Sequence, residues 1–145
     1  SANAGEALGP ISRIASGGEL SRIMLALKNV FAEKDGVDAL IFDEIDTGVS
    51  GVAAQRVAEK LASLGRTKQV LCVTHLPQIA AMADAEFTVE KRVEHERTYT
   101  SVLHLDDSGR RQELARLIGG SMITETTLAG AAELLRLADE AKRGI

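Results

Sequence analysis

Two adjacent carboxylates, Asp43 and Glu44, follow an apolar run at residues 39–42 and form a candidate catalytic pair. Such a run is typical of a buried parallel strand, and α/β sheets place ligands at the carboxyl ends of these strands. Asp43 can hold a hydrated Mg²⁺, which prefers oxygen ligands. Glu44 can accept a hydrogen bond from an attacking water and act as its general base. A strand that merely ends in solvated acids would show the same pattern.

A glycine-rich helix start at residues 16–20 precedes the acid pair. The first N–H groups of a helix are unpaired and lie at the positive end of its dipole, and Gly17 and Gly18 let a large anion approach them closely. Ser16 adds a hydroxyl that can donate to a phosphate oxygen, while Glu19 stands at the capping-box spacing from Ser16. The segment therefore indicates either a phosphate-facing site or an ordinary capped helix.

The turn after the acid pair and a histidine further along complete the candidate set. Asp46 and Ser50 bound this turn, and Ser50 can also simply cap the next helix. His75 ends a second apolar run. If the two apolar runs are neighbouring parallel strands, His75 lies close to the acid pair, where a neutral imidazole can hydrogen-bond a phosphate or the attacking water.

The elements expected around these residues would gather them at one edge of a sheet. Helical periodicity follows Ser16 and ends at Gly36, and a second periodic stretch begins at Val52 and ends at Gly65. These helices alternate with strands expected at residues 39–42 and 70–74. Strand, helix and strand within about 35 residues form a βαβ unit, whose apolar strands we expect to be covered on both faces.

The remainder of the chain indicates an antiparallel hairpin and two closing helices. In order, we expect a short helix at 77–83, strands at 87–89 and 98–102 joined by a charged tip at 90–97, a turn at 106–109, and helices at 110–118 and 124–142. The fold class is therefore α/β, with a parallel βαβ core, an antiparallel hairpin and C-terminal helices. No internal repeat or domain boundary is visible.

Composition narrows the class of protein. The 145 residues make about one ordinary domain, and the net charge of −4 argues against a broad basic surface for nucleic acid. The single cysteine, Cys72, excludes an internal disulfide and a multi-cysteine zinc site, and it agrees with a reducing cytoplasm. No apolar run approaches the roughly 20 residues that cross a bilayer. Residues 1–10 are polar and Gly-rich, which is typical of a linker and not of a signal peptide.

Other chemistries fit less well. Ser16, His75 and Asp43 provide the residue types of a hydrolase triad, but no G-x-S-x-G elbow occurs. The three histidines, His75, His95 and His104, are too scattered for a zinc site. The expected tip interleaves basic and acidic residues, which predicts a solvated tip and not a DNA contact. Its charged residues are Glu90, Lys91, Arg92, Glu94, Glu96 and Arg97.

The candidate residues occur in the order and at the spacing of an ABC ATPase. Residues 16–19 resemble the ABC signature, residues 40–44 resemble a Walker B motif with its catalytic glutamate, and His75 resembles the switch histidine. Longer strings are similar to the RecN family of SMC-like ABC ATPases, namely residues 14–28, 42–51, 73–80 and 113–120. Over nearly its whole length, the chain resembles the C-terminal half of a RecN-type ATPase head, residues 1–145 being one partial head.

The resemblance implies a partner half and a role in the cell. In RecN proteins an N-terminal half with Walker A and a long coiled coil precede the C-terminal half, and two heads sandwich ATP and Mg²⁺. The implied function is bacterial DNA double-strand break repair and recombination. The implied partners are the Walker A half, a second head in an ATP-dependent homodimer and, for the full-length protein, DNA. The implied location is cytoplasmic and nucleoid-associated, with no membrane partner.

The resemblance also implies a role for each candidate residue. Asp43 would position Mg²⁺, Glu44 would be the general base, and His75 would sense the γ-phosphate. The signature residues would approach the γ-phosphate of the partner head's ATP in trans, and these are Ser16, Gly17, Gly18 and Glu19. Asp46 and Ser50 would lie in the D-loop region beside the nucleotide.

Three departures from the family pattern matter. No G-x-x-x-x-G-K-[ST] motif occurs, so we expect the isolated chain to bind ATP poorly and to lack ATPase activity. The glutamine-bearing loop is not identifiable either. Ser50 stands where the common ABC D-loop ends in Asp, which argues against a carboxylate role there. The alternatives left open are a nucleotide-binding domain of an ABC transporter and a non-catalytic module that docks a partner.

Overall fold

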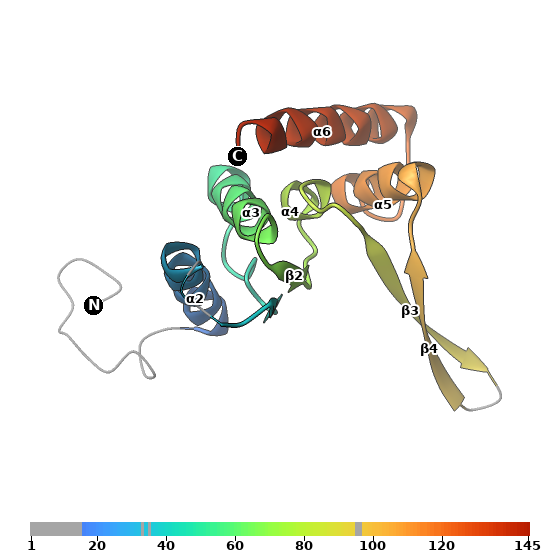
Figure 1. Ribbon diagram of the computed structural model, residues 1–145. Helices are drawn as coiled ribbons and strands as arrows, with labels where there is room; N and C mark the ends of the chain where they lie inside the picture. The colour runs from blue at the N-terminus through green and yellow to red at the C-terminus, as the bar shows by residue number, and fades with distance from the viewer. Residues whose placement is uncertain (1–15, 33, 35, 95–96) are drawn as a thin grey trace, which may run out of the picture.

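The computed structural model describes residues 16–32, 34, 36–94 and 97–145, and the expected linker at residues 1–10 lies outside this part. Helices and strands alternate first (Figure 1), as α2 (Gly17–Phe31), β1 (Ala39–Phe42), α3 (Gly51–Gly65), β2 (Gln69–Cys72) and α4 (Pro77–Ala81). The hairpin strands β3 (Phe87–Glu94) and β4 (Arg97–His104) and the helices α5 (Asp107–Gly119) and α6 (Glu125–Arg143) follow. This mixture confirms the predicted α/β class.

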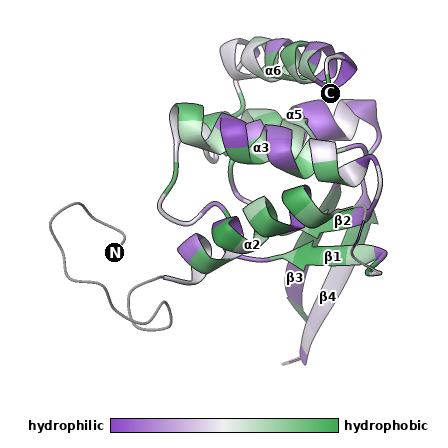
Figure 2. Cartoon of the chain, turned by 60° about the vertical axis from the view of Figure 1, so that its left-hand side comes forward, coloured by the Kyte–Doolittle hydropathy of each residue, from purple (hydrophilic) through white to green (hydrophobic). Residues whose placement is uncertain are grey.

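The predicted βαβ unit is present. Strands β1 and β2 pair in parallel, with Ile41 opposite Leu71 and Phe42 opposite Cys72. Helix α3 connects the strands and contacts β2, and α2 lies against α3 (Figure 2). The ladder continues one bond further, because the Val73 amide donates to the Phe42 carbonyl at 3.0 Å. The carboxyl ends of the two strands are therefore side by side, as the sequence predicted.

One face of this strand pair is open, which corrects the expectation that both faces are covered. Ile41 is 74% exposed, and Leu71 and Val73 on the same face are also exposed. The alternate residue Phe42 is buried in the core, because the helices of the described residues cover only its face. Three apolar side chains therefore face outward at the edge where the acid pair lies.

The apolar stripe of α2 is also largely uncovered. The helix forms where periodicity predicted it, but only Gly18 and Leu25 are buried. The stripe residues are all exposed, namely Leu20, Ile23, Met24, Leu27, Val30 and Phe31. Exposed apolar side chains gathered on one helix are typical of an interaction surface.

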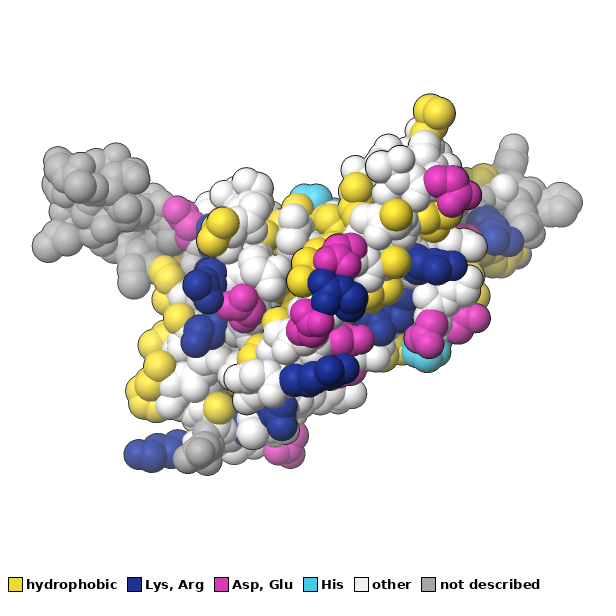
Figure 3. Space-filling model, turned by 90° about the horizontal axis from the view of Figure 1, so that it is seen from above, with side chains coloured by type: hydrophobic (Ala, Val, Ile, Leu, Met, Phe, Trp, Pro, Cys, Tyr) yellow, Lys and Arg dark blue, Asp and Glu magenta, His cyan; other side chains and the backbone are white. Residues whose placement is uncertain are grey.

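The core lies among α3, α4, α5 and α6. Ile45, Leu64 and Leu114 are its largest fully buried side chains. Two cations join the closing helices to the loop before β3, because Arg110 donates to the Ala83 carbonyl at 2.8 Å and Lys142 contacts Asp84. Seen from the α6 side (Figure 3), basic and acidic side chains are interleaved, and this face carries no broad basic patch.

The hairpin is longer than predicted. Its antiparallel register runs from Phe87 opposite His104 to Glu94 opposite Arg97, so most of the expected charged tip lies within the strands. Charged side chains do not prevent backbone pairing, and Arg92 pairs with Glu90 at 3.1 Å along β3. The hairpin projects from the helical body (Figure 1). Within the described ranges, no helix combines the length and apolar character that crossing a bilayer requires.

Candidate functional site

The acid pair stands at a sharp turn at the end of β1. Glu44 has φ 57, a left-handed conformation that costs a non-glycine residue about 1–3 kcal/mol and is concentrated at functional sites. The turn is held from both sides, because the Asp43 carboxylate accepts from the Glu44 amide at 2.8 Å and the Asp43 carbonyl accepts from the Ser21 hydroxyl at 2.9 Å. Both acidic side chains are exposed, so each is open to a ligand.

The glycine-rich start of α2 lies against this turn. A Cβ placed on Gly17 would collide with the Glu44 carboxylate, and a Cβ on Gly18 would lie 2.8 Å from the Glu44 carbonyl oxygen and 2.9 Å from that of Thr47. Gly17 is exposed and Gly18 is buried. Gly18 is therefore required for the helix to pack against the backbone of this turn, whereas at Gly17 only the flexible end of the exposed Glu44 side chain would have to move. Gly17 also keeps an accessible backbone.

The Gly18 contact gives a direct prediction for stability. We expect Gly18→Ala to lower the free energy of unfolding by about 1–3 kcal/mol, because two backbone carbonyls must shift to admit the methyl group. Urea unfolding followed by circular dichroism measures this change. Gly65→Ala is the matched control, since nothing lies within 4 Å of a Cβ there. At that helical position we expect a gain of about 0.5–1 kcal/mol, and an equal effect of both variants would contradict the close approach.

The predicted capping box at the start of α2 is present. The Glu19 amide donates to the Ser16 hydroxyl at 3.3 Å, and the Glu19 carboxylate accepts from the Ser16 amide at 2.7 Å. The Ser16 hydroxyl also donates to this carboxylate at 3.0 Å. The hydrogen bond from the Ser16 amide, joined by that from its hydroxyl, lowers the pKa of Glu19. Ser16 is exposed at the helix end, and its hydroxyl would have to rotate away from Glu19 to reach a phosphate.

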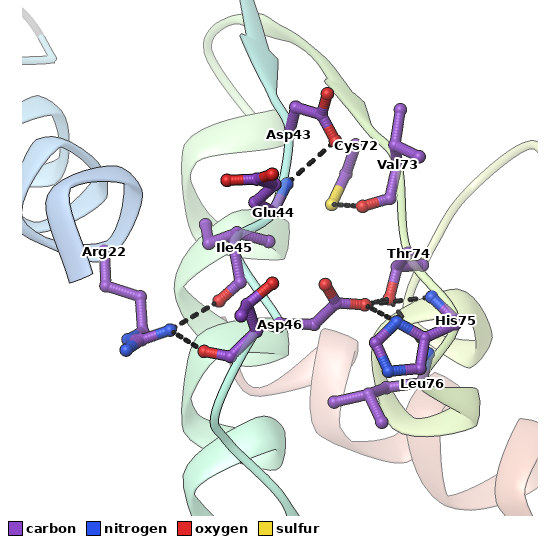
Figure 4. Close-up of polar contacts among 11 residues, drawn as sticks. Arg22, Asp43, Glu44, Ile45, Asp46, Cys72, Val73, Thr74, His75 and Leu76 are labelled. Atoms are coloured by element: carbon purple, nitrogen blue, oxygen red, sulfur yellow. Dashed lines mark hydrogen bonds and ion pairs between the residues drawn. The ribbon is translucent and has the colours of Figure 1, made fainter. Parts of the chain in front are cut away.

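Asp46 anchors the two strand ends to each other. Its side chain is buried, and one carboxylate oxygen lies 2.7 Å from the Thr74 hydroxyl, 2.9 Å from the His75 amide and 2.9 Å from His75 Nδ1 (Figure 4). Burial raises the pKa of Asp46, but the hydrogen bonds from Thr74 and the His75 amide outweigh it, so the pKa lies below its usual value. A charged carboxylate therefore holds the backbone and ring of His75.

This anchor orients the His75 ring. A carboxylate only accepts hydrogen bonds, so Nδ1 carries the proton and Nε2 is left for another partner. The side chain is 72% exposed. The structure thus brings His75 to Asp46, and no hydrogen bond or ion pair within the described residues joins His75 to Asp43 or Glu44. Ser50 is the exposed N-cap residue of α3, without a side-chain capping bond.

The cysteine beside the site, Cys72, has a raised thiol pKa. Burial, with smaller contributions from the charges of Asp46 and Asp43, raises the pKa of Cys72 to about 12. The thiol is therefore protonated at neutral pH, whereas the thiolate is the nucleophilic and metal-binding form. Among the described residues, no group of three or more His, Cys, Asp and Glu side chains is arranged to hold a metal ion.

The structure adds three residues that the sequence analysis did not select. Arg22 donates to the Ile45 and Thr47 carbonyls, and the Thr74 hydroxyl donates to the Asp46 carboxylate (Figure 4). The Ser21 hydroxyl donates to the Asp43 carbonyl. All four hydrogen bonds join residues more than 20 positions apart. No local spacing rule reports such a contact, although Ser21 and Arg22 do lie within a string that resembles the family.

The fold is similar to that of a solved protein. The structure resembles a solved chain described with the structural biochemistry of ATP-driven dimerization and DNA-stimulated activation of SMC ATPases, with a TM-score of 0.56 over 82% of this chain and 71% of that chain. At 22% identity the likeness concerns the fold alone, which is that of an SMC ATPase head. No protein-family model matches the sequence.

Sequence relatives name the family. The chain is 52% identical over 144 residues to the DNA repair protein RecN of Treponema pallidum, 51% over 135 residues to that of Vibrio cholerae, and 48% over 142 residues to that of Bacillus subtilis. The alignments cover 99%, 93% and 98% of this chain. The chain belongs to the RecN family, and it spans about a quarter of the length of these curated relatives.

Proposed function

We propose that this chain is the C-terminal part of the ATP-binding and ATP-hydrolysing head of a RecN protein. One observation carries the proposal. The glycine-rich helix start, the acid pair Asp43 and Glu44, and the Asp46-anchored His75 all lie at the carboxyl edge of one parallel strand pair. That edge is where α/β sheets bind nucleotides.

The proposed chemistry is in-line attack of water on the γ-phosphoryl group of ATP. A Mg²⁺ ion in such sites is held by one or two carboxylates together with substrate phosphates, and the exposed Asp43 carboxylate fits that requirement. When bound, the ion would neutralise charge on the phosphates. Glu44 accepts the proton of the attacking water. His75, with its Nδ1 proton donated to Asp46, presents Nε2 as an acceptor for a hydrogen bond from the water, and the imidazolium form would donate from Nε2 to the γ-phosphate. Most of the rate enhancement would come from positioning and electrostatics.

In this proposal the start of α2 contacts the ATP that is bound to the partner head. Ser16 and Gly17 are exposed, and the first N–H groups of the helix form an anion-binding end. They would stabilise the γ-phosphate of ATP held by the partner head, and Glu19 would keep this end capped. Asp46 and Ser50 would line the D-loop side of the same nucleotide. ATP would thus join two heads, and hydrolysis would release them.

The head also requires the half that carries Walker A. The open strand face and the α2 stripe expose apolar side chains that a folded head would cover. The chain spans about a quarter of its relatives, which leaves ample sequence for the covering half. We therefore assign this surface to the N-terminal half of the same head, and we assign ATPase activity to the combined halves and not to this chain alone.

The proposed cellular role is DNA double-strand break repair and recombination, in the cytoplasm and at the nucleoid. The relatives are named DNA repair proteins, and the structural neighbour is described as activated by DNA. The chain has a net charge of −4, and the face of the described residues seen in Figure 3 carries no broad basic patch, so DNA would bind mainly to other parts of the full-length protein.

Reconstitution tests this proposal. The chain is mixed with the Walker A half of a RecN head, ATP hydrolysis is followed by phosphate release, and dimerisation is followed by light scattering. We expect hydrolysis only with both halves, and dimers only with ATP. A head that assembles from the two halves but neither hydrolyses ATP nor dimerises with it would overturn the proposed function.

A further inference from the structure

The Arg22 side chain reaches from α2 to the turn after the acid pair. Its Nη1 atom donates to the carbonyl oxygens of Ile45 at 3.1 Å and Thr47 at 2.8 Å (Figure 4). Hydrogen bonds from a cation are stronger than those between neutral groups. One guanidinium nitrogen therefore holds the backbone on both sides of Asp46.

Two other residues of α2 hold the same stretch of backbone. Gly18 approaches so closely that a Cβ there would lie within 3 Å of the Glu44 and Thr47 carbonyl oxygens, and Ser21 donates to the Asp43 carbonyl at 2.9 Å. The first turns of α2 thus contact residues 43–47 at several points. A displacement of the helix start would be transmitted directly to this segment.

The same segment holds the histidine from its other side. Asp46 lies between the two carbonyls that Arg22 binds, and its carboxylate bonds to Thr74 and to the amide and ring of His75. Hydrogen bonds therefore hold the backbone of residues 45–47 to Arg22 on one side and, through the Asp46 carboxylate, to His75 on the other. In the proposed dimer, the start of α2 and His75, which these contacts connect, face different ATP molecules.

We propose that Arg22 is a positioning residue that couples the glycine-rich start of α2, which faces the partner's nucleotide, to His75, which faces the nucleotide of its own head. The proposal rests on the proposed function. It predicts that Arg22 affects hydrolysis at the site of its own head, even where the partner supplies an intact α2.

Mixed dimers separate the two sites. In a full-length RecN protein in which this chain supplies the matching segment, one subunit carries Arg22→Met and its differently tagged partner carries Glu44→Gln. Purification through both tags isolates the mixed dimer. The partner's own site lacks its base and does not turn over. Turnover therefore comes from the other site, which combines the acids and His75 of the Arg22→Met subunit with the unmodified α2 of the partner.

We expect kcat at this remaining site to fall about 10-fold with little change in KM, because a misplaced catalytic group slows the chemical step. Arg56→Met is the matched control, since Arg56 borders the same groove between α2 and α3 but bonds to Glu59. Arg22→Lys, whose ammonium retains donors and charge, should restore part of the rate. Turnover equal to that of the Arg56→Met control would overturn the coupling.

Two further measurements distinguish coupling from a role of Arg22 in folding. ATP-dependent dimerisation and the melting temperature of the Arg22→Met protein should remain close to those of the control. If the Arg22→Met protein lost ATP-dependent dimerisation and also melted at a clearly lower temperature, Arg22 would have a folding role and the proposal would be overturned. The exception is an Arg22→Lys protein that still forms an intact dimer but has a lower kcat, which would support the proposal. If the unmodified full-length protein neither hydrolyses ATP nor dimerises with it, the proposed function itself has failed.

Discussion

Glu44→Gln is expected to reduce ATP hydrolysis by the reconstituted head about 10²–10⁴-fold, the range that a positioned general base contributes. Glutamine keeps the size of the side chain but cannot take the proton of the attacking water. The left-handed backbone at Glu44 places this side chain beside the glycine-rich start of α2, at the edge where the γ-phosphate would lie. Phosphate release under single-turnover conditions measures the chemical step directly.

Dimerisation should behave differently from hydrolysis in this variant. Because ATP remains unconsumed between the heads, the Glu44→Gln dimer should persist longer than the unmodified dimer in size-exclusion chromatography with ATP. Glu140→Gln is a suitable control, since Glu140 is an exposed acid on α6 that pairs with Arg136. Unchanged hydrolysis in the Glu44→Gln head would remove Glu44 from the role of base.

Asp46→Ala should cause the largest loss of stability among the site variants, about 2–4 kcal/mol in the free energy of unfolding. The Thr74 hydroxyl and the His75 amide would lose their common acceptor, and a partly buried donor left unpaired costs roughly 1–3 kcal/mol. Denaturant unfolding of the head measures this change. Asp139→Ala is the matched control, because Asp139 is an exposed acid in a surface pair with Lys142.

The Asp46 effect should depend on pH in a defined direction. The folded-state pKa of Asp46 lies below its unfolded value, so the charged carboxylate stabilises the fold above about pH 4, near the ordinary pKa of Asp, and this contribution is lost as pH falls through the folded-state pKa. The stability difference between the unmodified protein and Asp46→Ala should therefore be full at neutral pH and shrink in acid. A difference that grows below pH 4 would contradict this account.

Hydrolysis should fall with stability in the Asp46→Ala variant, for a separate reason. Without the carboxylate, neither the backbone nor the ring of His75 is held at the strand end. Thr74→Val keeps Asp46 and its bonds to His75 while removing one donor, so it should lose less activity. Equal losses in both variants would show that the Thr74 hydroxyl, and not the orientation of His75, matters most.

Local sequence patterns were enough to predict the helices and strands of this protein, and the strand and helix ends that carry the candidate catalytic residues. The apolar runs before Asp43 and near Cys72 predicted two parallel strands, and the Ser16 and Glu19 spacing predicted the capping box. The boundary errors arose where sequence signals are weak. In the hairpin, charged residues near Arg92 were assigned to a tip, because strand pairing through backbone groups leaves no mark in side-chain charge.

Only the tertiary structure decided which groups contact one another and which apolar faces remain open. The periodicity of α2 identified the stripe that includes Leu27, but not that its side chains stay exposed among the described residues. The sequence predicted that Asp46 lies in the D-loop region, but not that it contacts His75, 29 positions away. It did not select Arg22, which contacts Ile45 from 23 positions away. The physical reason is the separation along the sequence over which each effect acts. Propensity, capping and periodicity act over a few neighbouring residues, whereas these hydrogen bonds exist only after packing brings distant segments together.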